Sequence, residues 1–107
     1  DVGIIPSIWQ EVFGYVGIEF LAKGIPIIGN NKGGIVDYTI DGLTGWINKT
    51  STAQELAEIM ENIIKNPEII QKYNDIIINK RKQLIKTMYE HFCEIDKIYK
   101  EILKEKV

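Results

Sequence analysis

Three short apolar runs, each flanked by turn-forming residues, constrain the fold of this 107-residue chain more than any other feature. They are VGII (residues 2–5), PIIG (residues 26–29) and GWIN (residues 45–48). Short apolar runs with β-branched residues between turn signals are typical of buried strands. A helical pattern from about Val12 to Lys23, closed by Gly24, separates the first two runs. This strand–helix–strand order predicts a parallel sheet that is covered on both faces.

The second half of the chain, residues 51–107, has the pattern of helices. Thr52 is a candidate N-cap, and Glu55 fits a capping box at the start of a helix that ends before Pro67. After Pro67, apolar residues recur every three or four positions toward the end of the chain. A single helix of about 40 residues would be unusual in a domain of this size. We therefore expect a break or sharp kink near His91–Glu94.

The composition narrows the class of protein. A hydrophobic fraction of 45% and a charged fraction of 26% indicate a globular domain rather than a disordered segment. The net charge of −2 gives no reason to expect nucleic acid as a partner. The single cysteine, Cys93, excludes an internal disulfide and suits a reducing compartment, so we expect a cytoplasmic protein. No run approaches the ~20 apolar residues of a membrane span.

Charge is unevenly distributed along the chain. Residues 1–64 hold 3 Lys and 8 Asp or Glu, whereas residues 65–107 hold 10 Lys or Arg and 7 Asp or Glu. The basic second part is compatible with peripheral contact to an anionic membrane surface. A solvated helix face of mixed charge explains the same pattern more simply.

Two carboxylates in and beside an apolar stretch pose the functional question. Nearly every residue from Phe13 to Leu21 is apolar, small or aromatic, yet Glu19 lies within this stretch and Glu11 lies eight residues before it. A buried charge without a partner is unfavourable, so three explanations compete. Glu19 pairs with a basic group elsewhere in the fold, it faces water, or its partner is a ligand.

The geometry of the predicted helix favours a ligand. If the helix begins near Val12, the next four amides have no intrahelical acceptor, and the positive end of the helix dipole makes them a phosphate site. Glu11 precedes this end, and Glu19 lies about 12 Å further along the axis. A nucleotide-sugar carries hydroxyls at both ends and phosphates between them, so it would satisfy all three groups. The four amides are those of Phe13, Gly14, Tyr15 and Val16.

Several short motifs follow one another in a defined order. They are PS (residues 6–7), EVFG (11–14), Glu19, AKGIPII (22–28), a GG loop (33–34) and DGLTG (41–45). With these motifs, residues 1 to about 48 resemble the donor-binding half of retaining GT-B glycosyltransferases, specifically glycosyltransferase family 4. The resemblance continues weakly through the helices, where HFCEIDKIYKEIL (residues 91–103) is similar to the closing helix of that family.

The resemblance implies an α/β fold. The expected architecture is that of a GT-B C-terminal domain: a partial Rossmann-like parallel sheet of about three strands, with helices on both faces and a long C-terminal helical region. Residues 1–107 would then form a single partial nucleotide-sugar-binding domain. Its donor-site part would lie in residues 1–50 and its C-terminal helices in residues 51–107.

The resemblance also implies roles for individual residues. The first Glu of the family motif contacts hydroxyls of the donor sugar and corresponds to Glu11, which is the expected catalytic and sugar-binding residue. The second Glu binds the ribose hydroxyls of the nucleotide and corresponds to Glu19. The amides that hold the sugar and the diphosphate correspond to Phe13, Gly14, Tyr15 and Val16. No Asp-x-Asp motif is present, so we expect neither a metal nor another cofactor, and the nucleotide-sugar would be a substrate.

The implied activity is transfer of a sugar from a nucleotide-sugar to a glycan or lipid-linked acceptor with retention at the anomeric carbon. The sequence lacks the N-terminal GT-B domain and the Arg and Lys that grip the diphosphate, so we expect a fragment that is inactive by itself. Its missing partner would be that N-terminal domain. The edge of the first strand and the C-terminal helix are surfaces through which a homodimer could form. Two alternatives stay open, a helical protein-interaction module and a part of a GT-B nucleotide-sugar epimerase.

Overall fold

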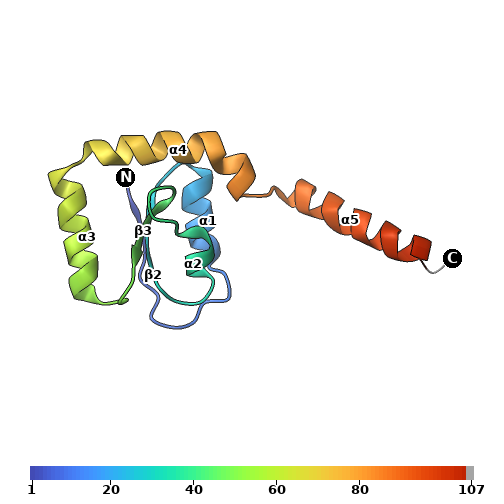
Figure 1. Ribbon diagram of the computed structural model, residues 1–107, viewed down its shortest axis with the longest axis horizontal. Coiled ribbons are helices and arrows are strands. Elements are labelled where there is room, and N and C mark those ends of the chain that lie inside the picture. Colours follow the sequence, from blue (N-terminus) through green and yellow to red (C-terminus); the bar gives the residue numbers. More distant parts are fainter. Residues whose placement is uncertain (106–107) are drawn as a thin grey trace.

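The three predicted strands form one parallel sheet in the order β1-β2-β3 (Figure 1). The structure, a computed structural model, describes residues 1–105. The strands are β1 (Gly3–Ile5), β2 (Ile27–Asn30) and β3 (Gly45–Asn48). In the sheet, Gly3 lies opposite Ile27, and Ile27 lies opposite Gly45. The apolar runs of the sequence therefore coincide with the strands, which confirms the predicted parallel sheet.

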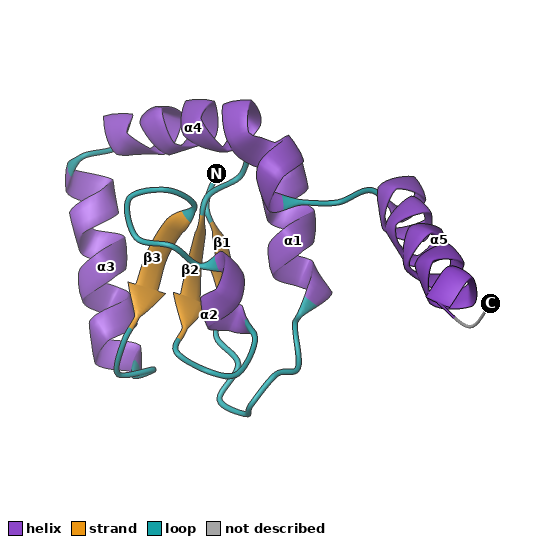
Figure 2. Ribbon diagram, turned by 45° about the vertical axis from the view of Figure 1, so that its right-hand side comes forward, coloured by secondary structure: helices purple, strands orange, loops and turns teal. Residues whose placement is uncertain are grey.

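Helices cover both faces of this sheet, as predicted. Figure 1 shows α3 on one face and the α1 and α2 helices on the other. Figure 2 shows α4 crossing the end of the sheet at which the strands begin, while the loops that follow the strands lie at the opposite end. The helices are α1 (Tyr15–Ala22), α2 (Ile35–Tyr38), α3 (Ala53–Lys65), α4 (Glu68–Leu84) and α5 (Met88–Glu105).

The core lies between the sheet and the layer of helices formed by α1, α2 and α4. Leu21 of α1, Ile27 of β2 and Ile77 of α4 are completely buried there. Tyr73 of α4 packs on Trp46 of β3 with 4.6 Å between their ring centroids. Because burying one such aliphatic side chain contributes about 1.5–3 kcal/mol, this cluster anchors α4 across the α/β part of the chain.

The long helical region breaks at residues 85–87, so the predicted break near His91–Glu94 is wrong by about one helical turn. Ile85 has an extended backbone and packs against the core, which ends α4 at Leu84. The Thr87 hydroxyl then accepts a hydrogen bond from the amide of Glu90 at 3.1 Å and caps the start of α5. The break thus follows from a local cap and one core contact, and the apolar repeat continues through it.

The α5 helix extends away from the rest of the molecule (Figure 1). None of its described side chains is buried. Met88, Phe92 and Tyr99 are 82%, 66% and 64% exposed. Among the helices in residues 1–105, none combines the length and apolar character needed to cross a lipid bilayer.

Candidate functional site

The predicted site residues lie on the loop between β1 and α1 and on α1 as far as Glu19. Figure 2 shows this loop at the end of the sheet where the parallel strands terminate. In open α/β sheets, ligands bind at this end because the loops after the strands are free to vary there. Glu11, Phe13 and Gly14 belong to the loop, whereas Tyr15, Val16 and Glu19 belong to the helix.

The α1 helix begins at Tyr15, three residues later than predicted. Gly14 has a φ of +82°, a left-handed conformation that ends the loop and cannot belong to an α-helix. Within the described part of the chain, the amides of four successive residues donate no hydrogen bond to a protein acceptor; these are Phe13, Gly14, Tyr15 and Val16. The amide of Gly17 is bonded to the carbonyl oxygen of Gly14 at 3.2 Å. The entry into α1 therefore presents a cluster of free donors at the positive end of a helix dipole.

Glu11 is half-buried and held by its own loop. One carboxylate oxygen, Oε1, accepts hydrogen bonds from the indole Nε1 of Trp9 at 2.6 Å and from the hydroxyl of Ser7 at 3.4 Å. Oε2 accepts none from residues 1–105. The carboxylate is thus oriented by two neutral donors and keeps one oxygen available for another hydroxyl group.

Two glycines of a second loop support the backbone of the first. The Gly33 amide donates to Oε1 of Gln10 at 2.6 Å, and the Gly34 amide donates to the carbonyl oxygen of Glu11 at 2.7 Å. A Cβ atom at Gly33 would overlap that same carbonyl oxygen, and one at Gly34 would overlap the carbonyl oxygen of Val12. The sequence marked this pair only as a loop. In the folded chain it is the surface on which the Glu11 segment rests.

Tyr38 is a site-supporting residue that the sequence did not reveal. Its hydroxyl donates to the carbonyl oxygen of Gly14 at 2.9 Å, and its ring packs edge-on against Phe13 with 5.5 Å between centroids. Burial raises the pKa of Tyr38, and the nearby charge of Glu11 raises it further. The one available signal was Gly17, a glycine inside a helix, because a Cβ atom there would collide with the Tyr38 ring.

Glu19 is exposed on α1 and has no hydrogen bond or ion pair with any residue in the range 1–105. It lies one turn after Tyr15, about 6 Å along the axis. The predicted 12 Å between Glu11 and Glu19 assumed a helical rise over all eight residues, whereas residues 11–14 form a loop. Pairing with a basic group of this chain is therefore excluded among the described residues. Glu19 and Glu11 share no direct contact, and the free amides lie between them in the chain.

Two buried asparagines tie the site loop to the ends of the other strands. Asn48, the last residue of β3, donates from Nδ2 to Oδ1 of Asn30 at 2.9 Å. Asn30, the last residue of β2, donates from Nδ2 to the carbonyl oxygen of Ser7 at 3.3 Å. The sequence signal was an Asn at the end of two apolar runs, Asn30 directly after PIIG and Asn48 as the last residue of GWIN, and the sequence interpretation left it unused.

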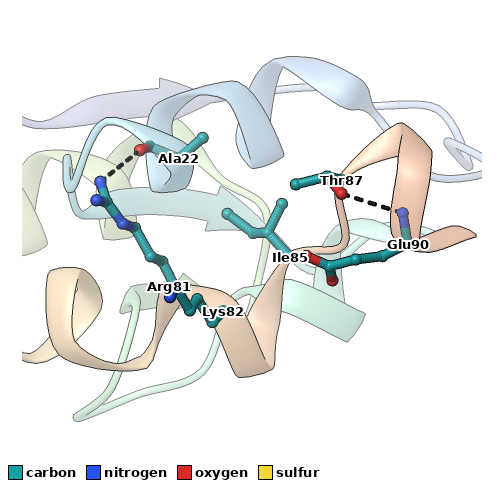
Figure 3. A pocket seen from close by; sticks show the side chains of 6 residues that line it. All are labelled: Ala22, Arg81, Lys82, Ile85, Thr87 and Glu90. Carbon is teal, nitrogen blue, oxygen red and sulfur yellow. Dashed lines mark hydrogen bonds between the residues drawn. The ribbon is translucent and has the colours of Figure 1, made fainter.

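A separate pocket of about 260 Å³ lies at the other end of α1, beside the break between α4 and α5 (Figure 3). Arg81 donates to the carbonyl oxygen of Ala22 at 3.5 Å along one side of it. It contains none of the predicted site residues. Within residues 1–105, no three His, Cys, Asp or Glu side chains are grouped closely enough to hold a metal ion.

Comparison with known proteins places the chain beside sugar-transferring enzymes. Residues 1–83 match the family described as glycosyl transferases group 1. The chain is 33% identical over 93 residues to lipopolysaccharide 1,2-N-acetylglucosaminetransferase of Salmonella typhimurium, a match that covers 83% of this chain and 22% of that protein. It is 29% identical over 107 residues to the capsular polysaccharide biosynthesis glycosyltransferase CapM of Staphylococcus aureus, covering 98% of this chain and 27% of that protein.

A third relative comes from Neurospora crassa. The chain is 32% identical over 55 residues to alpha-1,3/1,6-mannosyltransferase alg-2 of Neurospora crassa, which covers 51% of this chain and 12% of that protein. The chain thus spans less than a third of the length of each of these relatives.

Proposed function

Because the chain belongs to the glycosyl transferases group 1 family, we propose that it is the donor-binding part of a retaining glycosyltransferase of family 4. The donor would be a nucleotide-sugar, and residues 1–107 would form a single partial domain that binds it. The relatives named above are described as glycosyltransferases. Their names support sugar transfer over the alternative of a nucleotide-sugar epimerase.

One observation carries this proposal. The amides of four successive residues, from Phe13 to Val16, are free where the chain enters α1, at the end of the sheet where ligands of open α/β folds bind. Backbone amides at a helix start favour phosphate groups, since the donors and the helix dipole act together. We assign the diphosphate of the donor to these amides.

The two carboxylates would bind the hydroxyl groups of the donor that lie on either side of its diphosphate. Glu11 would bind the donor sugar and act as the catalytic residue, because one of its oxygens is oriented by Trp9 and Ser7 while the other is free. Glu19 would bind the ribose hydroxyls of the nucleotide. Its carboxylate has no protein partner in the described residues, and a charge-assisted pair with two vicinal hydroxyls is strong and selective.

The chemistry that we propose is glycosyl transfer with retention at the anomeric carbon. The bond between the sugar and the diphosphate breaks, and a bond forms between the sugar and the acceptor oxygen, whose proton passes to the leaving diphosphate. The transition state resembles an oxocarbenium ion. The free amides would stabilise the negative charge that develops on the leaving diphosphate. We propose that no divalent metal is needed for that step.

The remaining proposals concern the intact enzyme. The acceptor would be a glycan or a lipid-linked glycan, supplied to the site by an N-terminal GT-B domain. Because this chain spans less than a third of its relatives' length, we propose that it binds the donor and does not transfer sugar by itself. Its setting would be cytoplasmic, with peripheral membrane contact through its basic second part.

Titration calorimetry of the chain with UDP, GDP and ADP tests the donor site. At least one of the three should bind, and Glu19→Ala should weaken that binding about tenfold or more, since a hydrogen bond to a charged group contributes about 1.5–3 kcal/mol. Glu58→Ala on α3 is the control, because Glu58 is also exposed and makes no hydrogen bond or ion pair in residues 1–105. Absence of binding to all three nucleotides would remove the proposal, and equal binding by Glu19→Ala would remove the ribose role.

The exposed α5 helix favours a second candidate, a helical protein-interaction module. Its apolar side chains, Met88, Phe92 and Tyr99 among them, are exposed and would be stabilised by burial against another chain. The two functions are compatible, because only the start of α5, at Met88 and His91, lies beside Phe13 and Tyr15, and the rest of the helix projects away from the donor site (Figure 1).

A further inference from the structure

We propose that Tyr38 is a positioning residue for the donor diphosphate, because its hydroxyl holds the carbonyl oxygen of Gly14 and so keeps the neighbouring free amides turned outward. The inference rests on the proposed donor site. It assigns to α2, a helix of four residues, the task of fixing the shape of the loop that enters α1.

The loop needs such a restraint at Gly14. Glycine has more backbone freedom than any other residue, and here it adopts φ +82° and ψ +80° with no side chain to hold it. A rotation at this residue would redirect the amides of Gly14 and Tyr15. The carbonyl oxygen of Gly14 accepts the 2.9 Å hydrogen bond from Tyr38 and a longer one of 3.2 Å from the Gly17 amide, and together they fix the peptide plane between Gly14 and Tyr15.

Aromatic packing supplies a second restraint from the same side chain. Tyr38 packs edge-on against Phe13, and Phe13 packs edge-on against Tyr15 with 5.8 Å between centroids. Two of the residues whose amides are free are therefore joined through their side chains to Tyr38. The loop is held on both sides of Gly14.

Space for the Tyr38 ring is built into α1. Gly17 faces the ring, and a Cβ atom at this position would collide with ring carbons of Tyr38. Glycine is otherwise a poor residue for the interior of a helix. Gly14 also leaves space for Tyr38, since a Cβ atom at Gly14 would come within 2.8 Å of the Tyr38 hydroxyl. The two glycines and the tyrosine thus form one unit, although 24 residues separate Gly14 from Tyr38.

The hydroxyl is suited to act as a permanent donor. Only 6% of Tyr38 is exposed, so the side chain acts on a ligand only through the loop residues that it contacts, Gly14 and Phe13. Burial and the charge of Glu11 both raise the pKa of Tyr38, so the hydroxyl keeps its proton throughout the neutral range. A positioning role follows, since the side chain touches the loop and is covered from the ligand side.

Tyr38→Phe removes the hydroxyl and keeps the ring, so it isolates the hydrogen bond. Tyr73→Phe is the matched control: Tyr73 is also buried, and its hydroxyl also bonds to a backbone group, accepting from the Gly42 amide at 3.1 Å. Titration calorimetry of the full chain would use inorganic pyrophosphate, UDP, GDP and ADP as probes. We expect Tyr38→Phe to weaken binding of pyrophosphate and of the preferred nucleotide by about five- to tenfold. Tyr73→Phe should leave both within about twofold of the original chain.

Amide NMR spectra separate positioning from general stability. In Tyr38→Phe without ligand, the amide signals of Gly14, Tyr15 and Val16 should shift, and their response to pyrophosphate should shrink. In Tyr73→Phe those signals should stay in place, even where its thermal unfolding midpoint falls as far as that of Tyr38→Phe.

The outcomes distinguish this inference from the proposed function. If the original chain binds none of the four probes, the donor site itself is overturned, and the role of Tyr38 with it. If it binds and Tyr38→Phe binds equally well, only the role of Tyr38 is overturned. If Tyr38→Phe fails to fold, NMR of the original chain provides the test. We expect a Tyr38 hydroxyl proton that is protected from exchange and shows nuclear Overhauser effects to Gly14 and Gly17, both without ligand and in the pyrophosphate complex. Absence of that signal would overturn the inference.

Discussion

At the residue scale, the site depends on close approach between two backbones. The loop that carries Glu11 lies directly on Gly33 and Gly34, and the two amides of these glycines bond to it. A side chain at either glycine would occupy space that carbonyl oxygens of the site loop already fill. The carboxylate that we assign to the donor sugar therefore owes its position to two residues that carry no side chain.

Gly33→Ala should destabilise the fold and displace Glu11. Gly33 has a φ of +49°, so alanine would be strained there and would also collide with the Glu11 carbonyl oxygen. Gly42→Ala is the control, because Gly42 has a φ of +79° and open space at its Cβ position. Urea unfolding should show a loss of about 1–2 kcal/mol for Gly42→Ala and of about 3 kcal/mol or more for Gly33→Ala. Equal losses would mean that the contact with Glu11 contributes nothing beyond backbone strain.

At the element scale, the start of α3 forms a capping box in which one of the two hydrogen bonds has a different partner from the one that the motif specifies. The Thr52 hydroxyl accepts from the Glu55 amide at 3.2 Å, as a capping box requires. The Glu55 carboxylate, however, accepts from the amide and the hydroxyl of Thr50, each at 2.7 Å. The predicted N-cap is therefore confirmed, and the returning bond reaches two residues further back than a capping box specifies.

Glu55→Gln should reduce the acid sensitivity of the fold. The hydrogen bond from the Thr50 amide, and then that from the Thr50 hydroxyl, lowers the pKa of Glu55 below its ordinary value of 4.5. A lowered pKa stabilises the folded state fully above pH 4.5, and this contribution is lost as the pH falls through the folded pKa. The free energy of unfolding should therefore decrease less between pH 7 and pH 3 in Glu55→Gln than in the original chain.

Glu58→Gln on the same helix is the control for that experiment. Glu58 is exposed and makes no hydrogen bond in the described residues, so its substitution should leave the pH profile unchanged. A Glu55→Gln profile that coincides with that of the original chain would show that the Thr50 contacts do not persist in solution.

At the scale of the whole molecule, α5 decides the shape. The chain measures 62 × 30 × 17 Å and has a radius of gyration of 16.9 Å, whereas a compact domain of this length would have about 13 Å. Figure 1 shows that the larger radius of gyration comes from α5, which projects from an otherwise compact α/β unit. The family match, which ends at residue 83, covers the same unit.

Removal of residues 86–107 should leave the stability of that unit nearly unchanged. The described part of α5 buries no side chain, while Ile85, which packs on the core, is kept. The free energies of unfolding of the whole chain and the shortened chain, measured with urea, should agree within about 0.5 kcal/mol. Small-angle X-ray scattering should give about 12 Å for the shortened chain and a value near 16.9 Å for the whole chain.

The same pair of chains tests the interaction module. If α5 pairs with a second copy, sedimentation velocity should show a concentration-dependent dimer for the whole chain and a monomer for the shortened one. A radius of gyration near 13 Å for the whole monomer would contradict the extended position of α5.

Much of this molecule could be predicted from the sequence, because many of its features depend on neighbours within a few residues. Apolar runs with β-branched residues made the strands, Gly24 closed α1, and Thr52 capped α3. The order of these elements led to the parallel sheet, since strands joined by helices run in the same direction. The free amides of Tyr15 and Val16 could be predicted for the same reason, because a helix start leaves its first amides without acceptors, whereas the amides of Phe13 and Gly14 are free in a loop that extends to Gly14.

Tertiary structure alone decided what holds the backbone of the site loop in place. The supports of the site join Gly33 to Gln10, Tyr38 to Gly14 and Asn30 to Ser7, all more than 20 residues apart. The left-handed turn at Gly14 and the break at Ile85 likewise depend on contacts with distant segments. Such contacts have no local pattern, because they exist only after the strands have paired and brought their loops to one end of the sheet.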